Sequence, residues 1–280
     1  ETRETFAFGL EKLLPHSRKQ ALVCESCDSR HRFRFVTTRE LCRDAVRLAA
    51  NLTDVSAVVG VARSGVLPAG IVAMQLNVPL LVAGAEGVRD PGAGWRLERS
   101  PKRTGVRVAV VDDTAMTGRS LREIRPIMER QYDLRNVSFA TVYANPFADP
   151  KPDTYAVALE KPHFLEWNLF NSVYSPHLAM DFDGVICEDI GADDDDDADR
   201  YVKALRQARP LHLPRRVRVP LIVTARLEKY REPTERWLKR HGVRWNALVM
   251  GPWPNRKERD KPMAVSEFKA KNFRRLWRAQ

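Results

Sequence analysis

Short apolar runs followed by helical patterns recur along this chain. Two runs, 57–61 and 108–111, hold four or five consecutive apolar residues, which is typical of strands buried on both faces of a parallel sheet. Small and polar residues follow each run, and helical patterns then extend over 66–76 and from Arg119 onward. This repeated order of strand, turn and helix predicts an α/β fold with a parallel sheet and flanking helices.

The second half of the chain repeats this order. Strands are predicted before Asp181, over 219–224 and near 245–250, and a helix over 233–241 that starts with a proline and stops at a glycine. Between the halves, prolines punctuate 148–175. There we expect 155–159 to add an edge strand to the first sheet, and Trp167 and Phe170 to pack the halves together. We therefore predict two α/β domains, over 1–172 and 176–280.

Candidate chemistry is densest after the run 108–111. Two carboxylates, Asp112 and Asp113, stand at the carboxyl end of this strand, and a turn of small and hydroxylated residues then leads into a helix. Free amides at a helix N-terminus bind phosphate, and the hydroxyls of the turn would add donors. Carboxylates repel phosphate but suit vicinal hydroxyls. The segment therefore predicts a site for a sugar phosphate such as a ribose 5-phosphate.

The segment 108–121 resembles the phosphoribosyl pyrophosphate (PRPP) motif of the type I phosphoribosyltransferases: a hydrophobic strand, two acids and T-x-x-T-G. The resemblance implies that phosphoribosyl passes from PRPP to a nitrogenous base, with release of pyrophosphate. It also implies that Asp112 and Asp113 hold the ribose hydroxyls. The residues it assigns to the 5-phosphate are Thr114, Ala115, Met116, Thr117, Gly118 and Ser120.

Two further segments resemble loops of the same family. The loop after the strand 57–61 would bind the pyrophosphate half, with the donor fork of Arg63 and the amides of Ser64 and Gly65. The segment 84–105 resembles a mobile loop that closes over the reacting pyrophosphate and excludes water; the alternative is a basic loop with no catalytic part. Its cationic candidates are Arg89, Arg96, Arg99, Lys102 and Arg103.

A second acid pair, Asp181 and Asp183, lies in the segment DFDGV, which resembles motif I of the haloacid dehalogenase (HAD) superfamily of phosphohydrolases. The resemblance implies that Asp181 is the nucleophile and a magnesium ligand. Asp183 would be the general acid/base, with its backbone carbonyl on the same ion. Thr224, in a segment similar to the second motif, would bond the transferred phosphoryl oxygen. The short spacing between the motifs leaves room for only a small cap; the alternative is an α/β domain without a ligand.

The superfamily also needs a lysine and a further acidic motif that completes the magnesium site. Lys269 is the candidate lysine, with Lys257 and Lys261 as rivals, and no acid follows Lys269. We therefore expect either a C-terminal truncation, with the acid beyond residue 280, or a weak metal site; the absence of an initiating Met makes truncation plausible at both ends. If Lys257 took the lysine's role, the acids that could serve are Glu258, Asp260 and Glu267.

Composition narrows the setting. The 280 residues, 44% hydrophobic, suffice for two modest cores. No apolar run approaches the roughly eighteen residues of a membrane helix, no secretory signal is seen, and four cysteines do not suggest a disulfide scaffold, so we expect a cytoplasmic protein. The net charge of +11 raises nucleic acid as a partner, but the basic residues are spread out and no nucleic-acid-binding motif occurs. Sites for pyrophosphate and nucleotides need positive fields, so the charge does not require a nucleic acid.

Two other clusters have simple interpretations. Cys24 and Cys27, with His31 and Cys42 nearby, could bind zinc, but their spacing matches no ribbon and metal-free thiols are the simpler interpretation. The acidic run 193–197 lies in the cap, where like charges repel and stay solvated, so an exposed tip is expected.

These observations predict a phosphoribosyltransferase domain followed by a HAD-like phosphatase with a small cap, and Mg²⁺ as the cofactor. The second domain would hydrolyse a phosphomonoester such as the nucleotide just formed; an RNA or DNA end is the alternative substrate. From another functional class, a regulatory module that binds PRPP or a nucleotide is the main alternative, although the long cationic loop favours catalysis. A homodimer is a candidate assembly.

Overall fold

The computed structural model describes residues 34–52, 54–91, 107–160, 163–172, 175–191, 194–195 and 198–279. Contacts divide the chain into two compact units, of which the described parts are 34–167, the first unit, and 168–279, the second unit. This division falls a few residues before the predicted end of the first domain at 172. Among the described residues, no helix is long and apolar enough to cross a membrane.

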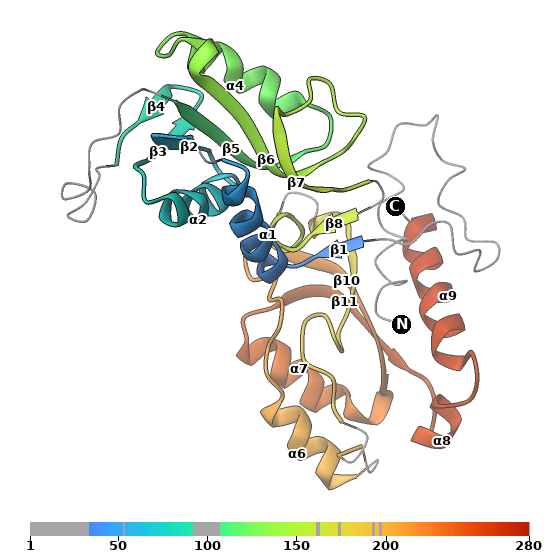
Figure 1. Cartoon of the computed structure of the whole chain (residues 1–280). Coiled ribbons are helices and arrows are strands. Elements are labelled where there is room, and N and C mark those ends of the chain that lie inside the picture. Colours follow the sequence, from blue (N-terminus) through green and yellow to red (C-terminus); the bar gives the residue numbers. More distant parts are fainter. Residues whose placement is uncertain are drawn as a thin grey trace. The chain divides into compact units, whose positions relative to one another are not determined.

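A six-stranded sheet forms the centre of the first unit (Figure 1). Its strand order is β4-β3-β2-β5-β6-β7, and all neighbours are parallel except β3 and β4. A separate parallel pair joins β1 (Arg34–Val36) to β8 (His163–Leu165). The strands of the large sheet are β2 (Ala57–Val61), β3 (Leu80–Gly84), β4 (Gly87–Arg89), β5 (Val108–Ala115), β6 (Val137–Ala144) and β7 (Thr154–Ala158).

Helices cover both faces of this sheet, as Figure 1 shows. Helices α1 (Thr38–Ala50) and α2 (Val66–Leu76) pack on the face that carries Ala109 and Val111, and α4 (Arg119–Glu129) packs on the face that carries Val108 and Val110. Because both faces are covered, β5 needs apolar residues at successive positions, which explains the run seen in the sequence. A 3₁₀ turn (Leu134–Asn136) leads into β6, and α5 (Glu166–Leu169) follows β8.

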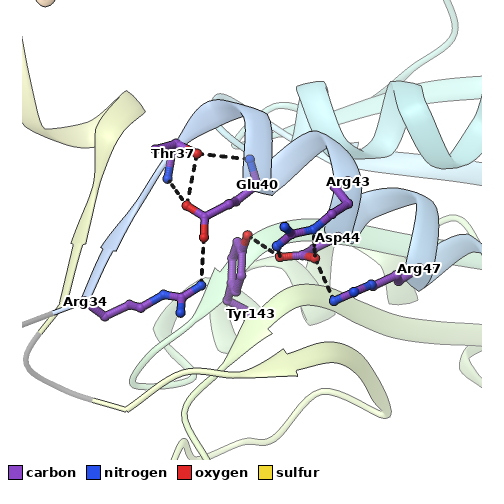
Figure 2. Close-up of polar contacts among 7 residues, drawn as sticks. All are labelled: Arg34, Thr37, Glu40, Arg43, Asp44, Arg47 and Tyr143. Atoms are coloured by element: carbon purple, nitrogen blue, oxygen red, sulfur yellow. Dashed lines mark hydrogen bonds and ion pairs between the residues drawn. The ribbon is translucent and has the colours of Figure 1, made fainter.

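A buried polar network fixes α1 to β6 (Figure 2). The Tyr143 hydroxyl on β6 donates to Asp44 Oδ2 at 2.9 Å, and Arg43 and Arg47 bond to Asp44 Oδ1 at 3.0 and 3.1 Å. Burial and the Asp44 carboxylate raise the pKa of Tyr143, so its hydroxyl stays a donor. The network gives a buried carboxylate partners on three sides, which offsets the cost of taking it out of water.

The start of α1 is capped by its own residues, which Figure 2 also shows. Thr37 and Glu40 form a reciprocal capping box, and Arg34 holds the other oxygen of Glu40 at 2.8 Å. The cap satisfies amides that the first turn leaves without partners.

The second unit contains a smaller parallel sheet, in the order β11-β10-β9. One face packs against the helices α6 and α7 through Met180, Ile222 and Trp237, and the other packs against α9 through Val223 and Phe273. Its elements are a 3₁₀ turn (Ser175–His177), β9 (Ala179–Asp181), α6 (Asp199–Gln207), β10 (Arg218–Leu227), a 3₁₀ turn (Glu228–Tyr230), α7 (Arg231–Arg240), β11 (Arg244–Gly251), α8 (Arg256–Arg259) and α9 (Ala264–Ala279).

The predicted α/β fold with a parallel sheet is confirmed in the first unit, and the predicted edge strand is β7. Three expectations were wrong in detail. Strand β5 continues to Ala115, so the acid pair lies inside the strand rather than after it. Part of the segment 84–105, which was expected to be a loop, forms β4, antiparallel to β3. In the acidic run, Asp195 is buried and bonded to Arg259 at 2.7 Å rather than solvated.

Replacing Tyr143 with Phe removes the hydroxyl donor to Asp44 and keeps the ring. We expect the free energy of unfolding to fall by about 1–2 kcal/mol, because a buried acceptor loses one of its partners. Urea unfolding followed by circular dichroism measures the change. Tyr155→Phe is the matched control, since Tyr155 on β7 is 42% exposed. Equal unfolding midpoints for the two variants would contradict the role assigned to the network.

Candidate functional site

Two adjacent carboxylates on the central strand β5 form the core of the candidate site. Asp112 is 5% exposed and Asp113 is 3% exposed. The Asp113 amide donates to Asp112 Oδ1 at 2.9 Å. The pair therefore has both carboxyl groups under cover at one end of the sheet.

The loop between β2 and α2 closes against this pair at Gly65. A Cβ atom at Gly65 would lie 2.8 Å from Asp112 Oδ1 and equally close to the carbonyl oxygens of Val61 and Val111. No side chain fits there, so glycine allows the loop to approach the acid pair. The loop also carries Arg63 and Ser64, and its Ala62–Arg63 peptide bond is cis. The structure thus brings the loop at Gly65 next to Asp112, although the two residues lie far apart in the sequence.

The turn after β5 is shaped by Gly118, which has a positive φ of 77°. A Cβ atom there would lie 2.2 Å from the carbonyl oxygen of Asp149, so the turn can only pass this loop with a glycine. Asn145 binds the same turn through the carbonyl oxygens of Ala115 and Met116, at 2.9 and 3.1 Å. The turn is therefore held by the loop after β6.

Helix α4 begins directly after Gly118. The N-cap glycine contributes no side chain, and the Thr117 hydroxyl accepts from the Arg119 amide at a long 3.4 Å. Amides in the first turn of a helix have no partner within the helix, and an eleven-residue helix adds its dipole, so this end suits an anion. Thr117 is exposed, whereas Thr114 and Ser120 are half-buried, so the predicted hydroxyls border the helix end.

The charge of the acid pair is set by its burial. Burial, followed by the charge of Asp113 and a hydrogen bond with it, raises the pKa of Asp112 from its ordinary 3.8 to about 8, although the Ser120 hydroxyl opposes this shift. Two carboxylates in contact cannot both ionise without strong repulsion. At neutral pH the Asp112 carboxyl therefore favours its protonated form.

Trp167 contacts the acid pair, which the sequence analysis did not predict. Its indole Nε1 donates to Asp113 Oδ2 at 2.5 Å, and its ring stacks on Tyr143 with ring centres 6.4 Å apart. Trp167 packs within the first unit against the acid pair, and the expectation that it also packs the two halves together stays a prediction. Phe170, expected to do the same, stacks on His212 within the second unit, at 4.4 Å. The neighbouring residues in sequence do not indicate that Trp167 packs in the first unit and Phe170 in the second.

Other predicted residues lie partly outside the described chain. Of the cationic loop candidates, Arg89 lies in β4 and forms an ion pair with Glu86. Cys42 is half-buried on α1 and is in no disulfide. Within the described residues, no group of three His, Cys, Asp or Glu side chains could hold a metal ion. The predicted residues outside the described ranges are Cys24, Cys27, His31, Arg96, Arg99, Lys102 and Arg103.

The second unit brings its four predicted catalytic side chains together. Asp181 ends β9 opposite Val223 of β10, and Lys269 of α9 forms an ion pair with Asp181. The Thr224 hydroxyl donates to Asp183 Oδ2 at 2.9 Å. Burial outweighs the charge of Lys269 and raises the pKa of Asp181 to about 6. These contacts form a compact polar cluster at the carboxyl ends of β9 and β10.

Arg226 is the residue that sequence reasoning missed in this cluster. It is 2% exposed, bonds to Asp183 Oδ1 through Nε at 2.9 Å and Nη2 at 2.6 Å, and lies 4.2 Å above the Phe182 ring. Its Nη1 is buried with no hydrogen-bond partner. The guanidinium neutralises Asp183 from inside the protein.

The ion pairs of Asp181 and Asp183 affect whether these two predicted ligands can hold magnesium. Each carboxylate already contacts a cation of the chain, and within the described residues no third metal-ligating side chain joins them. The residues as placed therefore do not fit a resident divalent ion. The alternative acids do not join them either: Glu258 pairs with Lys261, and Asp260 pairs with Arg256 and Arg259.

Several known proteins are similar to the first half of the chain. Xanthine-guanine phosphoribosyltransferase of Cereibacter sphaeroides is 26% identical over 137 residues, which cover 45% of this chain and 76% of that protein. The enzyme of the same name from Nitratidesulfovibrio vulgaris is 28% identical over 145 residues, covering 48% and 81%. Among solved structures, a purine phosphoribosyltransferase from Pyrococcus horikoshii is 24% identical, with a TM-score of 0.36, and covers 48% of this chain and 92% of that chain.

The sequence profile of the phosphoribosyl transferase domain matches residues 36–177, just over half of the chain. The matched region contains the acid pair, the loop that approaches it through Gly65, and the helix end after Gly118. This match confirms the resemblance of the first half at the level of the family. The chain therefore belongs to the phosphoribosyl transferase domain family.

Proposed function

We propose that the first unit transfers the phosphoribosyl group from PRPP to a purine base and releases pyrophosphate. The observation that carries the proposal is the placement of the buried acid pair between the Gly65 loop and the N-terminus of α4. One ligand with a vicinal diol flanked by two anionic groups would match all three features. The names of the xanthine-guanine relatives support a purine as the accepting base.

The proposed roles follow from this placement. Asp112 and Asp113 accept hydrogen bonds from the ribose hydroxyls or share a proton with them, and the first-turn amides of α4 and the hydroxyls of Thr117 and Ser120 bind the 5-phosphate. Arg63, with the amides of Ser64 and Gly65, faces the pyrophosphate. Negative charge on the acid pair would also stabilise positive charge that develops on the ribose ring as the bond to pyrophosphate breaks.

Magnesium in this reaction would arrive with the pyrophosphate of the substrate. The acid pair suits a diol better than a metal, since one of its carboxyls favours the protonated form and the other already accepts from Trp167. The chain's own residues therefore bind and orient the sugar and its two anionic groups.

For the second unit we propose a phosphohydrolase of the HAD type acting on a phosphomonoester, such as the nucleotide formed by the first unit. The meeting of Asp181, Thr224 and Lys269 at the ends of two parallel strands favours it. Asp181 would attack the phosphorus, while Lys269 and Thr224 would turn to the phosphoryl oxygens. The P–O bond to the alcohol would break as the aspartyl phosphate forms, and Asp183 would give a proton to the leaving oxygen. Asp183 would then take a proton from the water that hydrolyses the aspartyl phosphate and restores Asp181. To bind, the phosphate of the substrate would have to replace Asp181 as the ion-pair partner of Lys269.

Two alternatives give different results in the same assays. A regulatory module would bind PRPP or a nucleotide but release no pyrophosphate with any purine. A phosphatase specific for nucleic-acid ends would hydrolyse a terminal phosphate on an oligonucleotide and leave nucleoside monophosphates intact.

The acid pair is tested by the double variant Asp112→Asn, Asp113→Asn. We expect PRPP binding to fall by at least about a hundredfold, because the ribose hydroxyls lose their charged acceptor. Calorimetry with PRPP measures the affinity, and the melting temperature shows that the fold persists. Unchanged affinity in the folded variant would refute the proposed ribose site.

The raised pKa of Asp112 predicts a pH dependence of stability. Between about pH 4 and pH 8 the folded chain holds a proton that the unfolded chain releases, so stability decreases as the pH rises through this window. Asp112→Asn cannot ionise, so we expect it to flatten this decrease and to be the more stable protein at pH 8. Urea unfolding of both proteins at pH 5 and pH 8 measures the slope. Parallel slopes would show that Asp112 ionises normally.

Asp181→Asn separates the two proposed activities. We expect it to abolish hydrolysis of p-nitrophenyl phosphate, because an amide cannot act as the nucleophile, and to leave pyrophosphate release from PRPP unchanged. In the unchanged protein, hydrolysis should fall below about pH 6, where Asp181 takes up a proton. If Asp181→Asn silences the transferase and spares the phosphatase, the assignment of the two sites is wrong.

A further inference from the structure

We propose that Trp167 is a positioning residue of the ribose site: its indole N–H holds one oxygen of Asp113, so that the other oxygen is directed at the ribose hydroxyls of PRPP. The inference rests on the proposed function of the first unit. It adds a residue to which no role in that function has so far been given.

The contact uses the two Asp113 oxygens differently. Oδ2 accepts the Trp167 Nε1–H bond at 2.5 Å, whereas Oδ1 has the Thr114 hydroxyl at 3.5 Å, too long for a strong bond. A carboxylate held at one oxygen by a rigid ring cannot rotate freely about its terminal bond. The Trp167 contact therefore restricts the direction of Oδ1. The carboxylate also shares a hydrogen bond with Asp112, and its two oxygens together keep acceptor capacity for a ligand hydroxyl.

The type of donor that binds Asp113 Oδ2 determines whether the charge of this carboxylate is neutralised. An arginine or lysine on Oδ2 would orient the carboxylate but would also neutralise it, as Arg226 does with Asp183 in the second unit. Indole is a neutral donor with a single N–H, so it orients Asp113 and leaves its negative charge in place. A charged, oriented acceptor is what a neutral diol needs, because hydrogen bonds to ionised groups are the stronger ones.

Trp167 packs against Tyr143, which belongs to the network that fixes α1. Its ring stacks on Tyr143 at an interplanar angle of 25°, and the Tyr143 hydroxyl is bonded to the buried Asp44. Asp44 in turn is held by Arg43 and Arg47. Consecutive contacts thus run from α1 through β6 to the acid pair on β5, and they restrain the plane of the indole.

The main test is Trp167→Phe, which keeps an aromatic ring against Tyr143 and removes the N–H. We expect the KM for PRPP to rise by about tenfold, the loss of one well-oriented charge-assisted contact, while the KM for the purine stays within about twofold. Trp245→Phe, on β11 of the second unit, is the matched control and should leave both constants unchanged. A purely structural role would instead lower the melting temperature and change both KM values together.

A second measurement uses the unchanged chain. With ¹⁵N-labelled tryptophan, the Trp167 indole N–H signal, assigned by its loss in Trp167→Phe, should exchange slowly with solvent and shift when PRPP is added. An indole signal that exchanges freely, or that is indifferent to bound PRPP, would overturn the proposal even if Trp167→Phe failed to fold.

The outcomes separate this inference from the proposed function. If the unchanged protein neither binds PRPP nor releases pyrophosphate with any purine, the proposed function fails. If the unchanged protein is active and Trp167→Phe has the same KM for PRPP, the proposed function stands and the positioning role of Trp167 is refuted.

Discussion

Two adjacent carboxylates near the carboxyl end of the central strand of a covered sheet are the constraint around which the first unit is arranged. Adjacent like charges with little access to water are strongly unfavourable, and the structure limits the cost in two ways. Asp112 favours its protonated form, and Asp113 receives a neutral donor from Trp167. Gly65 lets the neighbouring loop close over the pair without displacing it. Burial of such a pair is difficult to explain by stability alone, and the proposed binding of ribose hydroxyls would account for it.

The second unit also contains a carboxylate pair, Asp181 and Asp183, but compensates its charge differently. There, each carboxylate has a cation of the chain: Lys269 for Asp181 and Arg226 for Asp183. The charges of this pair are balanced within the chain. An anionic substrate would therefore have to displace Asp181 from its ion pair with Lys269. The proposed ligands differ accordingly: a diol at the first site and a phosphoryl group at the second.

Much of the first unit could be predicted from sequence because its signals are local. The run 57–61, the helix Val66–Leu76 and the helix start at Arg119 depend on residues within a few positions of each other, and the structure has them at those bounds. The acids were recognised for the same reason. The contacts of Trp167 with Asp113 and of Arg226 with Asp183 join residues 54 and 43 positions apart, and only the folded chain brings them together. The burial of Asp195 likewise depends on Arg259, 64 positions later, which a local view of an acidic run could not include.

The most direct test of the central claim is a crystal structure of the chain with PRPP bound. The account predicts the ribose hydroxyls within hydrogen-bond distance of Asp112 and Asp113, with the Trp167 contact to Asp113 retained. The 5-phosphate should lie at the first turn of α4 and the pyrophosphate beside Arg63. A ribose bound away from an unchanged acid pair would contradict the account.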